Sequence, residues 1–220
     1  MRNPIQLSIK SELPMIILIL ISVMASFWFY QNMPEMVPTH WGFNGQADGW
    51  SSSGFAAFFF PVLILGIYLL MITLPSLDPR QERYAEFIKP FWVIRFLLVT
   101  FLVLVYFAAS LVGVGYDLSI SKIVSVGVGL LFVILGNYLG KIKPNWFVGI
   151  RTPWTLSNEE VWNKTHRLGG KLFIILGLFF IFSFLIPISW IFPLMIGLVL
   201  LVSLGSMVYS YILYRKLPRQ

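Results

Sequence analysis

Six long apolar runs follow one another along the chain, separated by shorter polar stretches. They cover approximately residues 13–31, 55–76, 91–113, 121–140, 172–188 and 190–213. A bilayer core about 30 Å thick requires about 20 apolar residues for each helical span. The pattern therefore predicts an all-α integral membrane protein, a bundle of about six transmembrane helices. The first run ends in FWFY and lacks a clear small-residue cleavage site, so we expect a retained span and not a signal peptide.

Composition agrees with this prediction. The chain is 58% hydrophobic and 11% charged, whereas soluble domains are about 45–50% apolar and about 25% charged. The lipid bilayer is thus the partner that the composition requires. No cysteine occurs, so neither disulfides nor thiol chemistry is available.

Basic residues predict the orientation. Fourteen of the sixteen Lys and Arg residues fall on one side of the predicted spans, and Arg95 lies about one turn inside the third span from that side. Only Lys122 lies near the opposite surface. Because basic loops stay in the cytoplasm, we expect both termini to be cytoplasmic. The net charge of +7 is divided among short patches beside anionic lipids, and it requires no nucleic acid.

Two regions follow from this topology. Residues 1–120 form a three-span region with an extracytoplasmic loop at 32–54, and residues 121–220 form a second three-span region with a cytoplasmic loop at 141–171. In the second loop, Pro144 and Pro153 predict an irregular first half.

A short cytoplasmic interfacial helix is expected between the fourth and fifth spans. Ser157 followed by Glu160 resembles a capping box, which predicts a helix from about residue 158 toward the fifth span. Gly169 and Gly170 are candidates for a bend where this helix enters the bilayer.

The fourth span is rich in small residues. Ser125 and Gly129, and Gly136 and Gly140, are each four apart, so a neighbouring helix can approach closely. We expect packing within the bundle in preference to a dimer contact.

Polar residues gather between the fourth and fifth spans and form the main candidate site. Two interpretations remain open. An Arg fork and Trp platforms suit a carboxylate or phosphate ligand, while Trp and basic residues also anchor helices at a membrane surface. The side-chain amide of Asn137, near the end of the fourth span, is expected to form a hydrogen bond between helices. The candidates are Asn137, Asn145, Arg151, Thr152, Trp154, Thr155, Glu160, Trp162, His166 and Arg167.

Arg95 is the one charge well inside a predicted span. Its position favours snorkelling to the inner headgroups, with Glu82 or Glu86 as a candidate partner. Ionisable residues inside the membrane are also candidates for function.

The loop at 32–54 holds a second set of polar and aromatic residues. Asn44-Gly45 and Asp48-Gly49 predict turns, and the tryptophans are typical of the outer membrane interface. One His with one carboxylate is a weak metal pattern, so we expect no metal site. The candidates are His40, Trp41, Asn44, Asp48 and Trp50.

Catalytic motifs such as HExxH, GxSxG and the phosphate-binding loop do not occur. We therefore expect neither an enzyme nor a cofactor. Two alternatives remain: a small-solute or lipid transporter using Arg95 and Asn137, and an enzyme acting on lipid headgroups through Glu160 and His166.

Two segments resemble a known family. GNYLGKIKPNWFVGIRTPWTLSNEEVWNKTHRLGGKLFIILG, at 136–177, is similar to the signature of the SdpI family of bacterial membrane immunity proteins. MPEMVPTHWGFNGQADGW resembles the extracytoplasmic motif of the domain of unknown function often placed at the start of such chains.

This resemblance implies a protein of the bacterial cytoplasmic membrane that confers immunity to a secreted peptide toxin. It also implies a second role, the retention of a cytoplasmic transcriptional repressor at the membrane. Our leading hypothesis assigns first contact with the toxin to the 32–54 loop or the lipid-facing helices. Coupling or inner-face binding is assigned to the signature segment.

Overall fold

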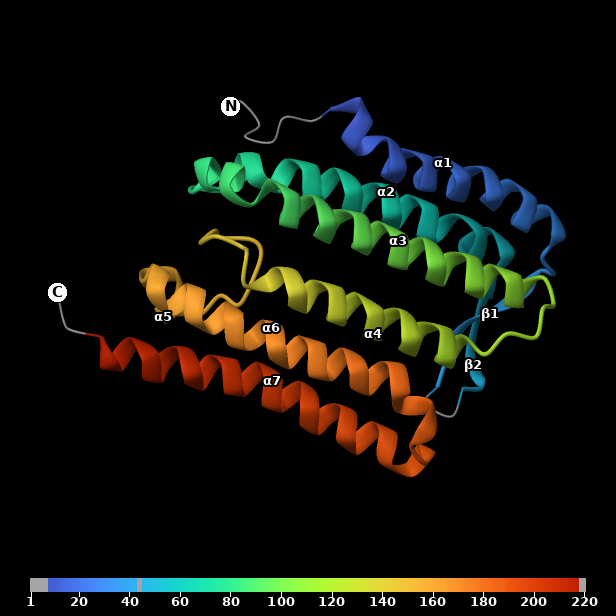
Figure 1. Ribbon diagram of the computed structural model, residues 1–220. Helices are drawn as coiled ribbons and strands as arrows, with labels where there is room; N and C mark the ends of the chain where they lie inside the picture. The colour runs from blue at the N-terminus through green and yellow to red at the C-terminus, as the bar shows by residue number, and fades with distance from the viewer. Residues whose placement is uncertain (1–7, 43–44, 218–220) are drawn as a thin grey trace. The chain divides into compact units, whose positions relative to one another are not determined.

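The computed structural model describes residues 8–42 and 45–217, and helices dominate it (Figure 1). Within these ranges, six helices are long and apolar enough to cross a membrane, which confirms the predicted fold class. Shorter elements connect some of them: the 3₁₀ helix η1 (Gln81–Phe87), helix α5 (Pro153–Ser157) and the 3₁₀ helix η2 (Ser183–Leu185). The six spans are α1 (Ile9–Asn32), α2 (Ser53–Leu77), α3 (Ile88–Gly113), α4 (Ile120–Leu139), α6 (Glu159–Phe182) and α7 (Ile188–Lys216).

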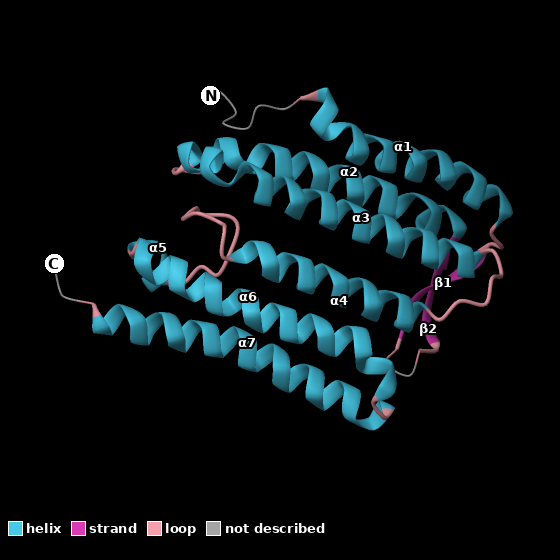
Figure 2. Cartoon of the chain, viewed as in Figure 1, coloured by secondary structure: helices cyan, strands magenta, loops and turns pink. Residues whose placement is uncertain are grey.

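In the chain, a two-stranded antiparallel hairpin joins α1 to α2 (Figure 2). Its strands are β1 (Met36–Trp41) and β2 (Ala47–Ser52). The backbone N–H of Gly45 donates to the Gly42 carbonyl in the connecting turn. The second predicted turn, at Asp48-Gly49, is wrong, because Gly49 pairs with His40 inside the ladder. Along β2, half-buried and exposed side chains alternate as in a strand, and this pattern overrides the local turn signal.

Two compact units make up the described chain. The hairpin unit comprises residues within 8–72 and 95–128, and the loop unit comprises residues 73–94 and 129–217.

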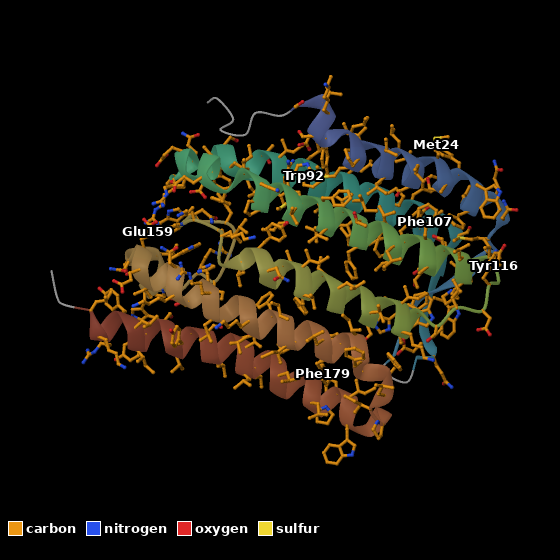
Figure 3. All side chains as sticks on the ribbon, in the orientation of Figure 1. Met24, Trp92, Phe107, Tyr116, Glu159 and Phe179 are labelled. Atoms are coloured by element: carbon orange, nitrogen blue, oxygen red, sulfur yellow. The ribbon has the colours of Figure 1, made fainter. Side chains whose placement is uncertain are left out.

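Aromatic packing forms the core of the hairpin unit near the strands. The rings of Phe29 and Tyr106 meet edge to face with centroids 5.8 Å apart, and Val37 of β1 is 1% exposed. Apolar side chains also cover the outer face of α1, where Met24 is 73% exposed (Figure 3). An apolar outer surface suits a helix that faces lipid chains.

A buried ion pair crosses the hairpin unit from α1 to α3. Arg95 donates to both carboxylate oxygens of Glu12, at 3.0 and 2.8 Å, and Tyr68 of α2 donates to the same carboxylate at 3.1 Å. Arg95 is 2% exposed and Glu12 is 5% exposed. Snorkelling and a pairing with Glu82 or Glu86 are therefore both wrong. A charged side chain that is buried away from water is costly unless an opposite charge lies nearby. Glu12, in the first turn of α1, supplies that charge to Arg95.

Glycines bring α4 and α6 into backbone contact in the loop unit. A Cβ added to Gly129 would lie 2.6 Å from the Gly177 carbonyl oxygen, and one added to Gly136 would meet the carbonyl of Gly170. The residue number rises along α4 from Gly129 to Gly136 while it falls along α6 from Gly177 to Gly170, so the two helices are antiparallel. This confirms the prediction that small residues of the fourth span pack within the bundle.

Helix α6 joins the expected interfacial helix and the fifth span in one uninterrupted element. Gly169 and Gly170 are both buried in it, and Gly170 meets Gly136 of α4. The N-cap is Asn158, whose side chain accepts from the N–H of Val161 at 3.0 Å. The predicted Ser157 cap is therefore wrong, because Ser157 closes the short helix α5 instead.

Substituting Gly136 with alanine should destabilise the protein, because the new Cβ has no room beside the Gly170 carbonyl. Overpacking of this kind typically costs about 1–3 kcal/mol. SDS-induced unfolding of the detergent-solubilised protein measures the loss. Gly197→Ala in α7 is the matched control, since no atom lies within 4 Å of its added Cβ. Equal unfolding midpoints for both variants would contradict the backbone contact.

Glu12→Gln and Arg95→Gln should each destabilise the protein strongly, because removing one partner of a buried pair typically costs about 3–5 kcal/mol. The triple variant E12M/R95M/Y68F should cost less than either single change, since it leaves no charge buried. Lys164→Gln is the control because this side chain is 51% exposed in its ion pair. SDS unfolding midpoints that are unchanged by the single changes would refute the buried pair.

Candidate functional site in the loop between α4 and α6

Asn145 organises the loop that follows α4. Its Oδ1 accepts from the N–H groups of Phe147 and Val148, at 2.9 and 2.6 Å. Its Nδ2 donates to the carbonyls of Lys143 and Val148, both at 2.9 Å. Asn145 is fully buried. An amide supplies donors and acceptors together, so this residue satisfies main-chain groups that no regular element pairs here.

Two threonines cap the short helix α5. The Thr152 hydroxyl accepts from the Thr155 N–H at 3.1 Å, and the Thr155 hydroxyl accepts from the Thr152 N–H at 2.8 Å. Pro153 occupies the first helical position, where no N–H is needed. The Thr152 hydroxyl also lies 3.0 Å from the Ser210 hydroxyl of α7. These side chains are therefore fully engaged in holding the loop to its neighbours.

Trp162 and His166 of α6 stack beneath the loop with ring centroids 4.0 Å apart. The Trp162 Nε1 donates to the Ile142 carbonyl at 2.8 Å. The His166 Nε2 accepts from the Ile150 N–H at 2.9 Å, and its Nδ1 lies 2.8 Å from the Trp162 carbonyl. A ring that accepts at one nitrogen and donates at the other is neutral.

Gly149 completes this contact. Its φ of +119° is accessible to glycine and strained for other residues. An added Cβ would also collide with His166 Nε2. The close approach of the loop to the histidine thus depends on glycine at this position.

Glu160 and His166 do not form an acid/base pair. Glu160 is exposed and accepts from Lys164 at 2.6 Å, whereas His166 is fully buried with both ring nitrogens bonded to main-chain groups. Proton exchange between these two side chains has no geometric basis in this arrangement.

Asp78 is a central residue that the sequence analysis missed. It is 3% exposed. Its carboxylate accepts from the Trp146 N–H at 2.9 Å, the Arg80 N–H at 2.8 Å and the Tyr84 hydroxyl at 3.1 Å. The available signal was the polar stretch DPRQER after the second span, whose arginines entered only the topology argument. Asp78 therefore fastens the loop to the segment before η1.

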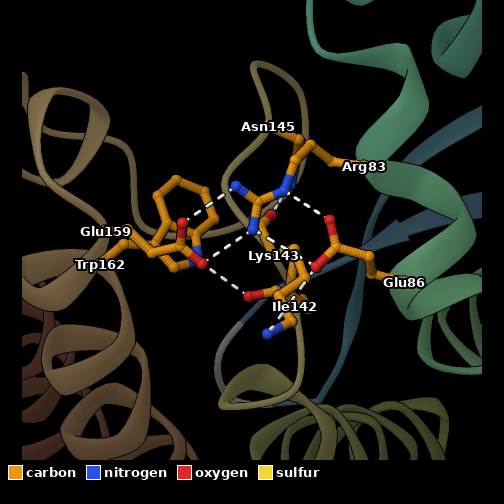
Figure 4. Close-up of polar contacts among 7 residues, drawn as sticks. All are labelled: Arg83, Glu86, Ile142, Lys143, Asn145, Glu159 and Trp162. Atoms are coloured by element: carbon orange, nitrogen blue, oxygen red, sulfur yellow. Dashed lines mark hydrogen bonds and ion pairs between the residues drawn. The ribbon is translucent and has the colours of Figure 1, made fainter.

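An ion-pair network joins η1, the loop and the start of α6 (Figure 4). Arg83 donates to both oxygens of Glu159, at 3.0 and 2.8 Å. Its Nε lies 2.7 Å from Glu86 Oε1, and Lys143 Nζ lies 4.0 Å from Glu86 Oε2. Each exposed pair contributes at most about 1 kcal/mol. Together they link three segments of the chain at the surface.

Other candidates of this region lie apart from the buried group. Arg151 is exposed and donates to the Trp146 carbonyl. The Trp154 ring packs against Tyr211 with centroids 5.0 Å apart, and Arg167 is exposed above Gly140. Asn137 donates to the Val133 carbonyl of its own helix at 2.8 Å, so the predicted helix–helix hydrogen bond is wrong. An amide can bond to its own preceding turn without a second helix.

The hairpin candidates form a separate exposed group in the other unit. His40 Nδ1 and Asp48 Oδ1 are hydrogen-bonded, with exposed fractions of 73% and 54% for the two side chains. Trp50 is 55% exposed, and Trp41 is half-buried. Asn44 lies outside the described residues. In the described ranges, no three His, Cys, Asp or Glu side chains are grouped to hold a metal ion.

The loop therefore presents a buried scaffold with an exposed rim. The scaffold comprises Asn145, Thr152, Thr155, Trp162 and His166, together with Asp78. We call the exposed part the loop rim; it comprises Trp146 and Arg151. Such a rim offers charge and one half-exposed indole for recognition.

Comparisons with known proteins match both parts of the chain. Residues 141–210 match the model of the SdpI/YfhL protein family, and residues 17–65 match a domain of unknown function, DUF1648. The chain is 31% identical over 208 residues to the immunity protein SdpI of Bacillus subtilis (strain 168), covering 94% of this chain and 98% of that protein. No solved structure matches. This multi-pass membrane protein belongs to the SdpI/YfhL protein family.

Proposed function

We propose that this protein gives its host cell immunity to a membrane-active peptide toxin. The observation that carries the proposal is the 31% identity to an immunity protein over 94% of this chain and 98% of that relative. The similarity therefore includes the hairpin as well as the signature loop. An interaction between proteins also suits the loop better than catalysis, because His166 uses both ring nitrogens in main-chain hydrogen bonds.

The proposed orientation has both termini in the cytoplasm. Its basis is the clustering of basic residues on one side of the spans. The hairpin then faces outward and the loop at 140–158 faces inward, because they are separated by an odd number of spans. Region 1–120 would then contact the toxin on the outer side of the membrane. Region 121–220 would bind the repressor on the cytoplasmic side.

The exposed face of the hairpin is the proposed site of first contact with the toxin. Trp50 is 55% exposed and shares this face of β2 with Asp48. A rigid aromatic side chain on a strand supplies contact area at low entropic cost. The paired strands hold it in place before the toxin arrives.

The loop rim is the proposed docking surface for a cytoplasmic transcriptional repressor. Arg151 is the central residue of this proposal because its side chain is exposed and, among the described residues, its guanidinium donates to the Trp146 carbonyl alone. The scaffold beneath the rim keeps these side chains in a constant arrangement. Retention of a repressor at the membrane would connect toxin exposure to gene expression.

Expression in a toxin-sensitive host tests the immunity proposal. Wild-type protein should raise survival well above the empty vector, and Trp50→Ala should lower it because the proposed contact loses its aromatic ring. Tyr116→Ala is the matched control, since Tyr116 is 60% exposed in the connection between α3 and α4. Survival equal to the empty vector across a panel of membrane-active peptides would refute immunity. Equal protection by the two variants would refute the hairpin contact alone.

Asn145→Ala and Arg151→Ala should have different effects, because Asn145 belongs to the buried scaffold and Arg151 belongs to the loop rim. Asn145→Ala removes four hydrogen bonds to main-chain groups, and each buried group left unsatisfied costs about 1–3 kcal/mol. It should lower both the SDS unfolding midpoint and survival. Arg151→Ala should preserve both, yet reduce the fraction of a repressor encoded beside the gene that sediments with membranes. A repressor that sediments equally with wild type, Arg151→Ala and empty membranes would exclude the docking role.

A further inference from the structure

Three basic side chains cluster at the loop end of α4 and α6 without acidic partners. Lys141, Arg167 and Lys171 are all exposed. Within the described residues, no carboxylate pairs with any of them, whereas Arg83, Lys143 and Lys164 nearby each have one. Lys141 Nζ lies 4.7 Å from the centre of the Tyr138 ring. The cluster thus carries uncompensated positive charge.

The glycine contact places these side chains on one side of the helix pair. Gly136 of α4 and Gly170 of α6 meet, and the helices are antiparallel. The next residue on each helix is rotated by about 100°, and in an antiparallel pair these rotations bring both residues to the same side. Asn137 and Lys171 therefore flank the same crevice.

Arg167 lies on the same side, and Lys141 lies in the turn just beyond the end of α4. Arg167 is one turn before Lys171, and the Cβ that Gly140 lacks would lie 3.3 Å from Arg167 Cγ. The Lys141 N–H donates to the Tyr138 carbonyl at 2.9 Å, which keeps this residue close to the end of α4. Asn137 uses one amide hydrogen in its bond to Val133, which leaves the second for a ligand. Glu160 also lies on this side, but Lys164 neutralises it at 2.6 Å.

An apolar surface continues from this cluster along the same side of the helices. Leu178 is two turns beyond Lys171 on α6, and Leu130 is two turns before Asn137 on α4. Their side chains are 44% and 50% exposed. A polar, basic end and an apolar track of this length match the two parts of a phospholipid.

We propose that this side of the α4–α6 pair binds one anionic phospholipid. Its phosphate lies against Arg167 and Lys171, with Asn137 and Lys141 at the edge, and an acyl chain follows Leu130 and Leu178. The guanidinium fork suits phosphate oxygens, and basic pockets between spans recognise anionic headgroups. The site is distinct from the proposed toxin and repressor contacts.

Native mass spectrometry of the full-length protein tests this proposal. The protein is equilibrated with phosphatidylglycerol or with phosphatidylcholine of the same chain length, and the bound fraction is compared. Wild type should prefer phosphatidylglycerol, and Arg167→Gln with Lys171→Gln should weaken its binding by about tenfold or more, since each basic residue contributes about 1 kcal/mol. Lys171→Gln alone should give a smaller loss while retaining the packing of Arg167 on Gly140.

Arg215→Gln with Lys216→Gln is the matched control, because it removes two charges from the last turn of α7. This control should retain the wild-type preference, and excess glycerol phosphate should leave the lipid bound. The proposal is overturned if R167Q/K171Q binds as wild type does, or if the α7 variant loses the preference equally. Displacement by glycerol phosphate would also overturn it, since that result assigns the cluster to a free phosphate compound.

Discussion

The backbone contact between α4 and α6 is the constraint on which the loop unit depends. Gly136 and Gly170 allow a separation that any side chain would prevent. This contact sets how α6 is rotated, and so which of its residues face the loop. Trp162 and His166 consequently lie beneath the chain that leaves α4, where they bond to Ile142 and Ile150. Without the glycines, the loop would lose the surface on which it folds.

Polar residues of the signature serve mainly to fold the loop. Asn145 bonds four main-chain groups, the two threonines cap α5, and His166 accepts from the main chain as a neutral ring. Unpaired main-chain groups are costly when buried, so an irregular loop requires side chains of this kind. A dense group of Asn, Thr, Trp and His therefore indicates a loop held by side-chain hydrogen bonds to the main chain as readily as it indicates a ligand site. Recognition then belongs to the exposed rim.

Charges inside the two units follow the same requirement for a partner. In the hairpin unit, Arg95 is paired with Glu12 and Tyr68. In the loop unit, Asp78 accepts three hydrogen bonds from its own surroundings. Burial makes each isolated charge expensive. The basic cluster at Arg167 differs because it is exposed and lacks such a partner within the described residues.

Sequence alone determined the six spans and the role of the fourth-span glycines, because hydropathy and residue size act locally and repeat with the helix period. It also marked the signature loop as unusual. Only the tertiary structure decided the partner of Arg95, since Glu12 lies 83 positions away in the chain. The tertiary structure also decided the hydrogen-bond partners of Asp78 and the burial of His166. Hydrogen-bond partners depend on which distant residues meet after packing, and no local pattern encodes that meeting.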